Sequence, residues 1–445
     1  MPASSPEPEL SGAPRPRCPP RPVVAAVEMG YGHLRAARAL AAALGSEVVL
    51  ADRPPLAGAD EQRLWRASRR LYEFTSRASQ LPVVGAPLRG ILDALTGIPP
   101  LYPYRDLSEP TLPVRSLERL IRRGLGAGLA AHLAESGAPL VTTYFAPALS
   151  ADVHGRSPVF CAVTDVDLNR AWVPLEPRKT GIRYLTPSRR AAKRLSSYGV
   201  PREQIEFTGF PLPHALLGGV ELPVLKRNLA ARLVRLDRKR VFRSQARHEI
   251  DQFLGPLPED EEGRPPLVTY AVGGAGAQAE QARPLVAALA PAVREGRLRL
   301  CLVAGVRTAV AERFAVWLRE AKLAEGAGVE ILLEATLESY LQRFERRLAE
   351  TDVLWTKPSE LTFYGALGLP LVLSPPVGFH ERYNRRWAVE NGVGLPQREL
   401  DQAGYWIREW LSEGTLAAAA WFGFLRLPKF GLYRILEVLG APLPL

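Results

Sequence analysis

His33 and Asp165 are the residues that the sequence places best to take a proton from a hydroxyl group. Each follows an apolar run, over 22–28 and 158–165, that is typical of a buried strand. Side chains at the carboxyl end of such strands lie where parallel sheets bind ligands. Each residue also has an ordinary alternative role, since a lone histidine is usually structural and an aspartate can cap the following turn.

Glycines at two strand ends could bring the backbone close to a phosphate or a sugar. The first group lies between the strand at 22–28 and a helix predicted over 34–44, and the second between a strand at 267–272 and a helix predicted from 279. Free backbone amides in such turns bind phosphate oxygens, although glycine turns are also common without any ligand. The glycines are Gly30, Gly32, Gly273, Gly274 and Gly276.

The stretch 351–395 contains two strand-to-helix switches in close succession. Apolar runs end at Trp355 and at Leu373, and helices are predicted over 361–367 and 380–391. Hydroxyl groups, a carboxylate and two helix N-termini therefore share one edge of a parallel sheet. Because helix N-termini favour anions, this edge is predicted to bind an anionic ligand.

These motifs together resemble the nucleotide-sugar site of GT-B glycosyltransferases. The branch they resemble holds the peptidoglycan N-acetylglucosaminyltransferase and the mono- and diglycosyldiacylglycerol synthases. That family has a Ser/Thr-rich turn, a Gly-Leu-Pro entry to the next strand, a loop with Gln or Glu, and an Asn before the next helix. The matching residues here are Thr356 to Ser359, Leu361-Thr362, Gly368-Leu369-Pro370, Glu381 and Asn384.

The resemblance assigns roles to individual residues. His33 and Asp165 would activate the acceptor hydroxyl, and the acceptor side would include Gly30, Gly32 and Trp172. Lys357 or Arg382 would stabilise the departing diphosphate. The expected donor-site residues are Gly273, Gly274, Gly276, Lys357, Ser359, Glu360, Leu361, Thr362, Glu381, Arg382 and Asn384.

The chain departs from the family pattern at two positions. The short helix after Ser359 is shorter than usual and carries Tyr364-Gly365 where the family has a glutamate that binds the ribose. Glu360 is the candidate replacement. Ala275 stands where the family's glycine turn has a hydroxyl group, so one side-chain hydrogen bond to the donor would be missing.

The resemblance implies an α/β fold of the GT-B type, in which two Rossmann-like, doubly wound parallel sheets face a cleft. The implied reaction transfers a hexose from a nucleoside diphosphate, with uridine diphosphate expected, to a hydroxyl of a lipid-linked or other acceptor. No cofactor is implied. No metal is implied either, because the donor turn lacks a paired acidic motif and the chain lacks metal-ligand spacing.

Three other functions are compatible with parts of the sequence. A nucleotide-sugar epimerase has the same architecture but needs further acid/base carboxylates. A non-catalytic protein that binds a nucleotide or a lipid would explain the altered ribose-binding helix and Ala275. Nucleic-acid binding rests on charge alone, and without interleaved aromatic residues or a binding motif we do not expect a nucleic-acid partner.

Composition narrows the class of protein. The net charge of +11 comes mainly from arginine and suits anionic partners, including an acidic membrane face, although a GC-rich genome would produce the same bias. The three cysteines are far apart and odd in number, which favours a reducing compartment. No 18-residue apolar run occurs. We therefore expect a cytoplasmic protein, with peripheral binding to the inner membrane face as an option.

The predicted organisation has five parts. A Pro-rich tail is followed by an acceptor-side domain with an apolar insertion, a basic helical insertion with an acidic linker, a nucleotide-sugar domain and a helical tail. Their bounds are 1–21, 22–213 (with the insertion at about 60–107), 214–266, 267–410 and 411–445.

Three helical segments have alternative interpretations. The insertion at 60–107 suits either a lipid groove or a packed element. The basic segment 223–253 suits either anionic lipid or a solvated helix face. The tail 411–445 suits either packing against the first domain, which we favour, or insertion into a bilayer face. A continuous helix is predicted over 115–136.

Overall fold

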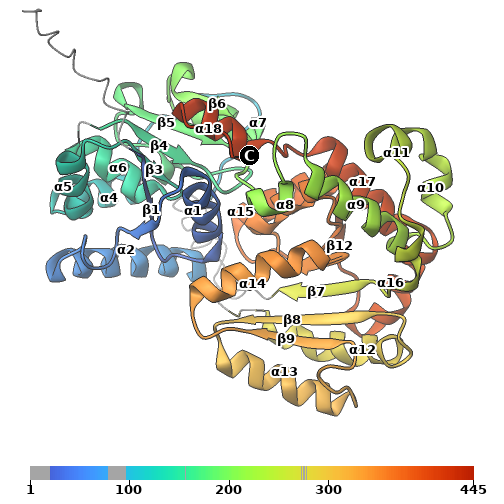
Figure 1. Ribbon diagram of the computed structural model, residues 1–445. Helices are drawn as coiled ribbons and strands as arrows, with labels where there is room; N and C mark the ends of the chain where they lie inside the picture. The colour runs from blue at the N-terminus through green and yellow to red at the C-terminus, as the bar shows by residue number, and fades with distance from the viewer. Residues whose placement is uncertain are drawn as a thin grey trace, which may run out of the picture.

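The computed structural model describes residues 21–78, 97–155, 157–271, 273, 276 and 278–444, with the backbone alone over 69–78. Within these residues the strands form two six-stranded sheets in which every pairing is parallel. Figure 1 shows the two sheets in separate halves of the molecule.

The first sheet is built from the N-terminal half of the chain and the second from the C-terminal half. In sheet order the first contains β2 (Val48–Leu50), β1 (Val23–Ala26), β3 (Leu140–Thr142), β4 (Val159–Ala162), β5 (Ile182–Thr186) and β6 (Ile205–Phe207). The second contains β12 (Gly394–Pro396), β11 (Leu371–Leu373), β10 (Val353–Thr356), β7 (Leu267–Ala271), β8 (Arg299–Gly305) and β9 (Val329–Leu333).

Both sheets reverse their strand order at one point. In the second sheet β7 pairs with both β8 and β10, which gives the strand order of doubly wound nucleotide-binding folds. In the first sheet the reversal lies between β1 and β3. Connections leave in opposite directions at such a point, so the carboxyl ends of the two strands are open to a ligand.

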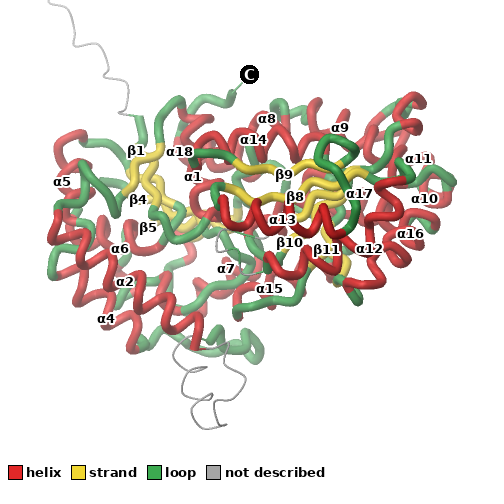
Figure 2. The backbone as a smooth tube through the Cα atoms, turned by 90° about the horizontal axis from the view of Figure 1, so that it is seen from below, coloured by secondary structure: helices red, strands yellow, loops and turns green. Residues whose placement is uncertain are grey.

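Helices cover both faces of each sheet. The strands are nearly continuous apolar runs because both of their faces are buried, as in β7, β10 and β4, where every residue is buried. Around the second sheet, α12 (Ala282–Arg294) and α13 (Thr308–Glu320) lie on one face and α14 (Leu337–Glu350) on the other (Figure 1). Figure 2 shows the helices around both sheets from below.

The helices next to the candidate site follow individual strands. After β1 comes α1 (Tyr31–Leu44), after β3 comes α6 (Phe145–His154), and after β5 comes α7 (Arg189–Ser197). After β10 comes the 3-10 helix η6 (Glu360–Leu367), and after β11 comes α15 (Phe379–Glu390). The predicted strand-to-helix switches are therefore confirmed, and α6 and β12 are additions that the sequence did not predict.

The helix predicted over 115–136 is wrong as a single element. The structure has α4 (Leu112–Arg122) and α5 (Ala127–Ser136), separated by Gly124 and Gly126 in left-handed conformations. A Cβ atom at Gly126 would lie 2.1 Å from Oγ of Ser150. The break also exposes amides of the second helix to the carboxylate of Glu61, which accepts hydrogen bonds from Gly126 and Gly128.

The basic segment 223–253 is partly internal. It forms α9 (Pro223–Leu236), α10 (Val241–Gln245) and α11 (Arg247–Leu254). Arg232 is fully buried and donates to backbone oxygens, and Arg235 is paired with Asp352. A fully solvated basic face is therefore wrong for this segment, because these guanidinium groups hold α9 against the second domain.

The acidic stretch 255–266 neutralises other arginines of the same segment. It contains the short helix η4 (Glu259–Gly263), whose Glu261 pairs with Arg235 and whose Glu262 pairs with Arg240 and Arg243. The linker therefore packs against α9 and α10 through opposite charges.

The C-terminal helices contact both domains. After α16 (Ala403–Ser412), α17 (Thr415–Arg426) packs against η6 and α9 in the second domain. The chain then returns, and α18 (Gly431–Leu439) contacts α1 in the first. Packing against the first domain is thus confirmed for α18, whereas the aromatic helix α17 belongs to the second domain.

The insertion at 60–107 begins with α2 (Ala59–Ala78), and its part over 79–96 lies outside the described residues. Ile98 and Leu101 are buried, whereas the rings of Tyr102 and Tyr104 are 58% and 55% exposed. Across the described residues, we find no helix that combines the length and the apolar character needed to span a membrane.

Candidate active site

His33 lies in the first turn of α1, directly beyond the carboxyl end of β1. Its Nδ1 atom is 2.8 Å from the backbone oxygen of Thr143, which follows β3. Since a carbonyl oxygen only accepts hydrogen bonds, Nδ1 carries the proton and Nε2 keeps its lone pair. The hydroxyl of Thr143 donates in return to the backbone oxygen of His33 over 2.8 Å. The hydroxyl of Thr164 lies 3.1 Å from the same Nδ1 atom. The Thr143 carbonyl thus holds the imidazole, and the Thr143 hydroxyl holds the backbone of His33, at the switch point of the first sheet.

The surroundings of His33 favour its neutral form. Burial is the largest influence and lowers its pKa, while Asp165, the hydrogen bond to Thr143 and Glu360 act in the opposite direction and His380 lowers the pKa further. The net shift is downward from the ordinary value of 6.5. A neutral imidazole with a free Nε2 lone pair can accept a proton near neutral pH.

Two aromatic rings lie close to the imidazole of His33. The centroid of the Tyr144 ring is 4.9 Å from the centroid of the imidazole, and that of the Trp172 ring is 6.2 Å from it. Trp172 is therefore next to the candidate base, as expected for the acceptor side. Gly30 caps α1 with a positive φ of 136°, a conformation that a side chain would strain.

Asp165 follows β4 and contacts the second domain. Its Oδ1 accepts a hydrogen bond of 3.0 Å from Nδ2 of Asn384, which also donates to the backbone oxygen of Pro358. The Asn384 oxygen accepts from the amide of Val166 over 2.9 Å. Asn169 caps the 3-10 turn Arg170–Trp172 further along the chain, and the alternative role of Asp165 as a cap of the bend after β4 stays a prediction. Asn384 is fully buried and joins the two domains beside Asp165.

Lys357 and Glu381 form the charged part of the C-terminal side. The ammonium of Lys357, beyond β10, lies 2.7 Å from Oε1 of Glu381 in the first turn of α15. The other oxygen of Glu381 accepts from the amide of Val377 over 2.7 Å. Burial opposes the charge on Lys357, but Glu381, Glu360 and Asp165 outweigh it and raise the lysine pKa. Lys357 is therefore a half-buried cation.

The glycine turn after β7 makes room for Lys357. Gly273 has a φ of +72°, and a Cβ atom there would lie 2.8 Å from Cε of Lys357. Only a glycine lets the lysine side chain cross the turn so closely. Gly276, with a φ of +65°, lies beside the side chain of Arg307. Since β7 and β10 are the two strands at the reversal of the second sheet, the lysine and the glycine turn share its switch point.

Glu360 makes a contact that its sequence position did not indicate. Its carboxylate forms a buried ion pair with Arg35 of α1, and Arg35 also donates to the hydroxyl of Tyr340 on α14. A Cβ atom on Gly32 would lie 2.7 Å from Oε2 of Glu360, so Gly32 permits this approach. The role of Glu360 in binding a ribose stays a prediction and would require the carboxylate to serve Arg35 at the same time.

The remaining predicted donor residues have mixed surroundings. Ser359 occupies the N-cap of η6 without a side-chain capping bond, and Leu361 is part of the hydrophobic core. The guanidinium of Arg382 lies over the ring of Phe379, 5.0 Å from its centroid. The hydroxyl of Thr362 is buried without a hydrogen-bond partner among the described residues. Gly274 lies outside those residues.

Sequence reasoning missed the partners that position these groups. Thr143 binds His33, while Arg35 and Tyr340 form the ion-pair cluster with Glu360. The signal for Arg35 is an arginine on the buried face of an Ala- and Leu-rich helix, one turn after Tyr31. A buried arginine needs an acidic partner, but the sequence does not say which carboxylate supplies it.

Two doubly wound parallel sheets whose carboxyl edges meet across a domain boundary define the GT-B architecture, and the polar cluster lies at that boundary. No family model matches the chain, and no curated protein matches it.

Several solved structures are similar to this chain over most of its length, at low sequence identity. One is a putative UDP-N-acetylglucosamine 2-epimerase from Listeria monocytogenes, with 12% identity, a TM-score of 0.48 and coverage of 94% of this chain and 96% of that one. Another is MnaA of S. aureus in complex with UDP, with 12% identity, a TM-score of 0.46 and coverage of 95% and 100%. A third is the glycosyltransferase SnogD from Streptomyces nogalater, with 14% identity, a TM-score of 0.44 and coverage of 95% and 99%.

Proposed function

We propose that this protein is a glycosyltransferase that moves a hexose from a nucleoside diphosphate, in the first instance uridine diphosphate, to a hydroxyl group of an acceptor. One observation carries the proposal. A histidine whose Nδ1 is bound to a carbonyl and whose pKa is lowered lies at the switch point of one sheet, and a half-buried lysine beside a glycine turn lies at that of the other. Base and cation therefore belong to opposite sides of one boundary, as transfer between two bound substrates requires.

The proposed step uses His33 and Lys357 in separate roles. The acceptor oxygen attacks the anomeric carbon of the sugar, and its proton passes to Nε2 of His33. The bond between the anomeric carbon and the phosphate oxygen breaks, and the nucleoside diphosphate leaves with the bonding electrons. Asp165, whose charge acts on His33, stabilises the imidazolium that forms. Lys357 and the amides of the glycine turn stabilise the charge on the leaving diphosphate.

The donor side would then hold the nucleotide through groups that are already in place. The hydroxyl of Thr362 is available for a hydrogen bond, and Ser359 and Arg382 lie on the same edge. Glu360 would bind the ribose from its ion pair with Arg35. The resemblance to the branch with the peptidoglycan and diacylglycerol enzymes supports a UDP-hexose as this donor.

A lipid-linked acceptor is the finer part of the proposal. Its support is a small surface of exposed aromatic and cationic side chains in the first domain. The rings of Tyr102 and Tyr104 are 4.6 Å apart between centroids, and the ammonium of Lys193 lies 5.9 Å from the centroid of Tyr104. Aromatic rings next to lysine suit the headgroup region of a membrane. A diacylglycerol acceptor in vesicles should then be used better than a soluble hydroxyl compound.

The first test is the melting temperature of the purified protein with a panel of nucleoside diphosphates and their sugars. A ligand that binds only the native state raises the free energy of unfolding, by about 2.7 kcal/mol when its concentration is a hundred times its Kd. The melting temperature rises accordingly. We expect the largest shift with a uridine nucleotide. Activity should persist in excess EDTA, because the proposed cation is Lys357 rather than a metal ion.

Lys357→Met should weaken binding of the uridine nucleotide at least tenfold, since it removes the cation next to the glycine turn. The matched control is Lys179→Met, which changes an exposed lysine paired with Glu176 and should leave binding intact. Lys357→Met also leaves Glu381 buried without its partner, which costs roughly 3–5 kcal/mol of stability. The double variant with Glu381→Gln should recover part of that stability but not nucleotide binding.

Product analysis separates the proposal from its rivals. Release of uridine diphosphate that depends on an added acceptor supports transfer. Inversion of a sugar centre without an acceptor would identify an epimerase, for which Asp165, Glu360 and Glu381 are the available carboxylates. Nucleotide binding without turnover in the presence of diverse acceptors would favour the non-catalytic alternative.

A further inference from the structure

A cavity lies on the far side of the nucleotide-sugar domain from the candidate active site. It encloses about 520 Å³, which is within the range of small-molecule sites. Pro266 and Leu298 line it, and they directly precede β7 and β8. It is therefore at the amino edge of the second sheet, whereas Lys357 and the glycine turn are at the carboxyl edge.

The interior of this cavity is apolar. Its walls come from the end of α9, from α12 and from α16, and they include Leu236, Ala292 and Leu411. Leu236 and Ala292 are already buried and form the floor, whereas Ala288 and Leu411 are only partly buried and Pro291 is exposed. Covering these accessible groups with hydrocarbon removes apolar surface from water and favours binding.

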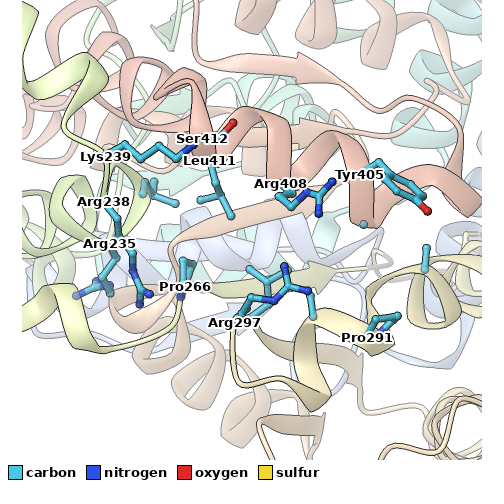
Figure 3. A pocket seen from close by; sticks show the side chains of 15 residues that line it. Arg235, Arg238, Lys239, Pro266, Pro291, Arg297, Tyr405, Arg408, Leu411 and Ser412 are labelled. Atoms are coloured by element: carbon cyan, nitrogen blue, oxygen red, sulfur yellow. The ribbon is translucent and has the colours of Figure 1, made fainter.

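The charged groups around the cavity are all cationic. Five basic residues line it, and no Asp or Glu is found among the described residues that do so. Figure 3 shows Arg297 and Arg408 on opposite walls, with Arg235 and Arg238 at one end and Tyr405 at the other. A concave surface lined by charges of one sign concentrates its potential and attracts a counter-ion.

Two of these cations are already neutralised within the protein. Arg235 pairs with Asp352 and Glu261, and Arg297 pairs with Glu295.

Three cations remain without a carboxylate partner in the described part of the chain. Arg238 donates only to the backbone oxygen of Arg264, and the guanidinium of Arg408 lies 5.9 Å from the centroid of the Tyr405 ring. Lys239 is exposed and contacts no acidic group there. Two of these positive charges lie in the turn after α9 and the third lies on α16, on either side of the apolar interior.

We propose that this cavity binds a small organic phosphate with an apolar body. The phosphate would be held by Arg238, Lys239 and Arg408, and the apolar body would cover Ala288, Pro291 and Leu411. Arginine forks match phosphate oxygens well, which favours a phosphate over a carboxylate of the same size. The ligand has two possible sources, a free alkyl or isoprenoid phosphate and a phospholipid in a membrane. The proposal does not depend on the reaction at the other edge of the sheet.

Titration calorimetry of the full chain with octyl phosphate, below its micelle concentration, tests this site. We expect saturable binding at one site per chain, with butyl phosphate at least tenfold weaker, because each methylene contributes about fourfold. Neutral octyl glucoside lacks the phosphate, and inorganic phosphate lacks the alkyl chain. Each should therefore bind at least tenfold more weakly than octyl phosphate. Equal binding of octyl glucoside and octyl phosphate would overturn the proposal, as would no saturable binding.

Two kinds of variant locate the binding. The pair Lys239→Glu and Arg408→Glu should weaken octyl phosphate at least tenfold, and Ala288→Phe should fill the cavity and do the same. Arg434→Glu is the matched control, because Arg434 is exposed on α18 and has no carboxylate partner in the described residues. Melting temperatures verify that each variant is folded. Unchanged affinity in both the charge variant and the filled variant would refute the assignment.

Vesicle sedimentation separates the two sources. Binding to vesicles of phosphatidylcholine with phosphatidylglycerol that is lost in the charge variant supports a membrane phospholipid. Variant-sensitive binding of octyl phosphate without vesicle binding supports a free phosphate. Both results support the site.

Discussion

A backbone carbonyl holds His33 in the form of a base. Because the Thr143 oxygen accepts the Nδ1 proton and burial favours the neutral ring, the lone pair of Nε2 is left to accept a proton. A histidine that only packs also needs a partner for its buried N–H, so the role of His33 as a base stays a prediction.

Replacement of His33 by glutamine should remove the base while keeping a polar side chain in place. We expect kcat to fall by about 10²–10⁴-fold, the usual contribution of a general base. In the wild type, kcat/KM should decline only below pH 6.5, because the pKa of His33 is lowered from that value. The variant should lose this acidic decline. A pH profile of kcat/KM measures both effects.

The control is His154→Gln, which changes an exposed histidine bonded to the backbone oxygen of Ile121. Its activity and pH profile should match those of the wild type. If the acidic decline persists unchanged in the His33 variant, another group, with Asp165 the nearest candidate, is the base. The shift of His33 also affects stability: the unfolded chain is protonated first as the pH falls below 6.5, so this residue lowers the free energy of unfolding in acid.

Single residues were predictable where a side chain that can carry a charge or move a proton directly follows a predicted strand. His33, Asp165 and Lys357 were predicted because apolar runs identify strands and parallel strands share one carboxyl edge, whereas Glu381 was predicted from the family resemblance. Their partners were not predictable, since Thr143 lies 110 residues from His33 along the chain. Which oxygen a side chain meets depends on the register between strands, and that is a tertiary property.

At the scale of elements, a carboxylate from one helix supports the start of another. Glu61 of α2 accepts hydrogen bonds of 2.8 and 3.0 Å from the amides of Gly126 and Gly128, and a further one of 3.0 Å from the indole of Trp65. The N-terminus of α5 thus has an acidic cap that comes from 65 residues earlier in the sequence. This contact fixes the angle between α4 and α5.

Glu61→Ala should therefore destabilise the first domain. The substitution leaves two buried amides and the indole N–H without an acceptor, and hydrogen bonds to a charged group contribute about 1.5–3 kcal/mol each, with only partial additivity. We expect a loss of roughly 2–4 kcal/mol in denaturant unfolding. Glu118→Ala removes a pair with the exposed guanidinium of Arg122 in α4 and should cost at most about 0.5 kcal/mol. Similar losses for both variants would contradict the capping role.

The elements themselves were largely predictable, and the exceptions have physical causes. Strands and helices of the second sheet follow the alternation of apolar runs and amphipathic segments, and β9 matches its predicted bounds. The break between α4 and α5 was missed because glycine alone does not end a helix, whereas the approach of Ser150 and Glu61 does. The internal arginines of α9 were missed because their acceptors, such as Thr351, come from another part of the chain.

At the scale of the whole molecule, the two domains are joined by a buried ion pair. Arg35 and Glu360 have 5% and 9% of their side chains exposed, so neither is well solvated, and Tyr340 completes the cluster. Breaking such a pair on one side leaves an unpaired buried charge. The same boundary also contains the bonds of Asn384 to Asp165 and Val166.

Arg35→Met and Glu360→Gln should each lower the free energy of unfolding by roughly 3–5 kcal/mol, and the double variant by less than their sum. Small-angle scattering should show a larger radius of gyration in each single variant, because the domains separate where the pair is lost. Arg38→Met is the matched control on the same helix. It removes pairs with Glu338 and Glu345, of which Glu338 is largely exposed, and should cost only about 1 kcal/mol. An unchanged radius in the Arg35 variant would mean that other contacts hold the domains.

The chain crosses between the domains twice, and the two crossings touch. The first leaves β6 at Gly209 and Phe210, and the second runs from α17 through Pro428 to Gly431 at the start of α18. A Cβ atom on Gly209 would lie 2.9 Å from Cβ of Pro428, and one on Gly431 would lie 2.1 Å from the backbone oxygen of Phe210. Two connecting segments that pack against each other restrict how one domain can move relative to the other. They favour rotation about a single axis and resist twisting, so an opening and closing motion would return the carboxyl edges of both sheets to the same alignment.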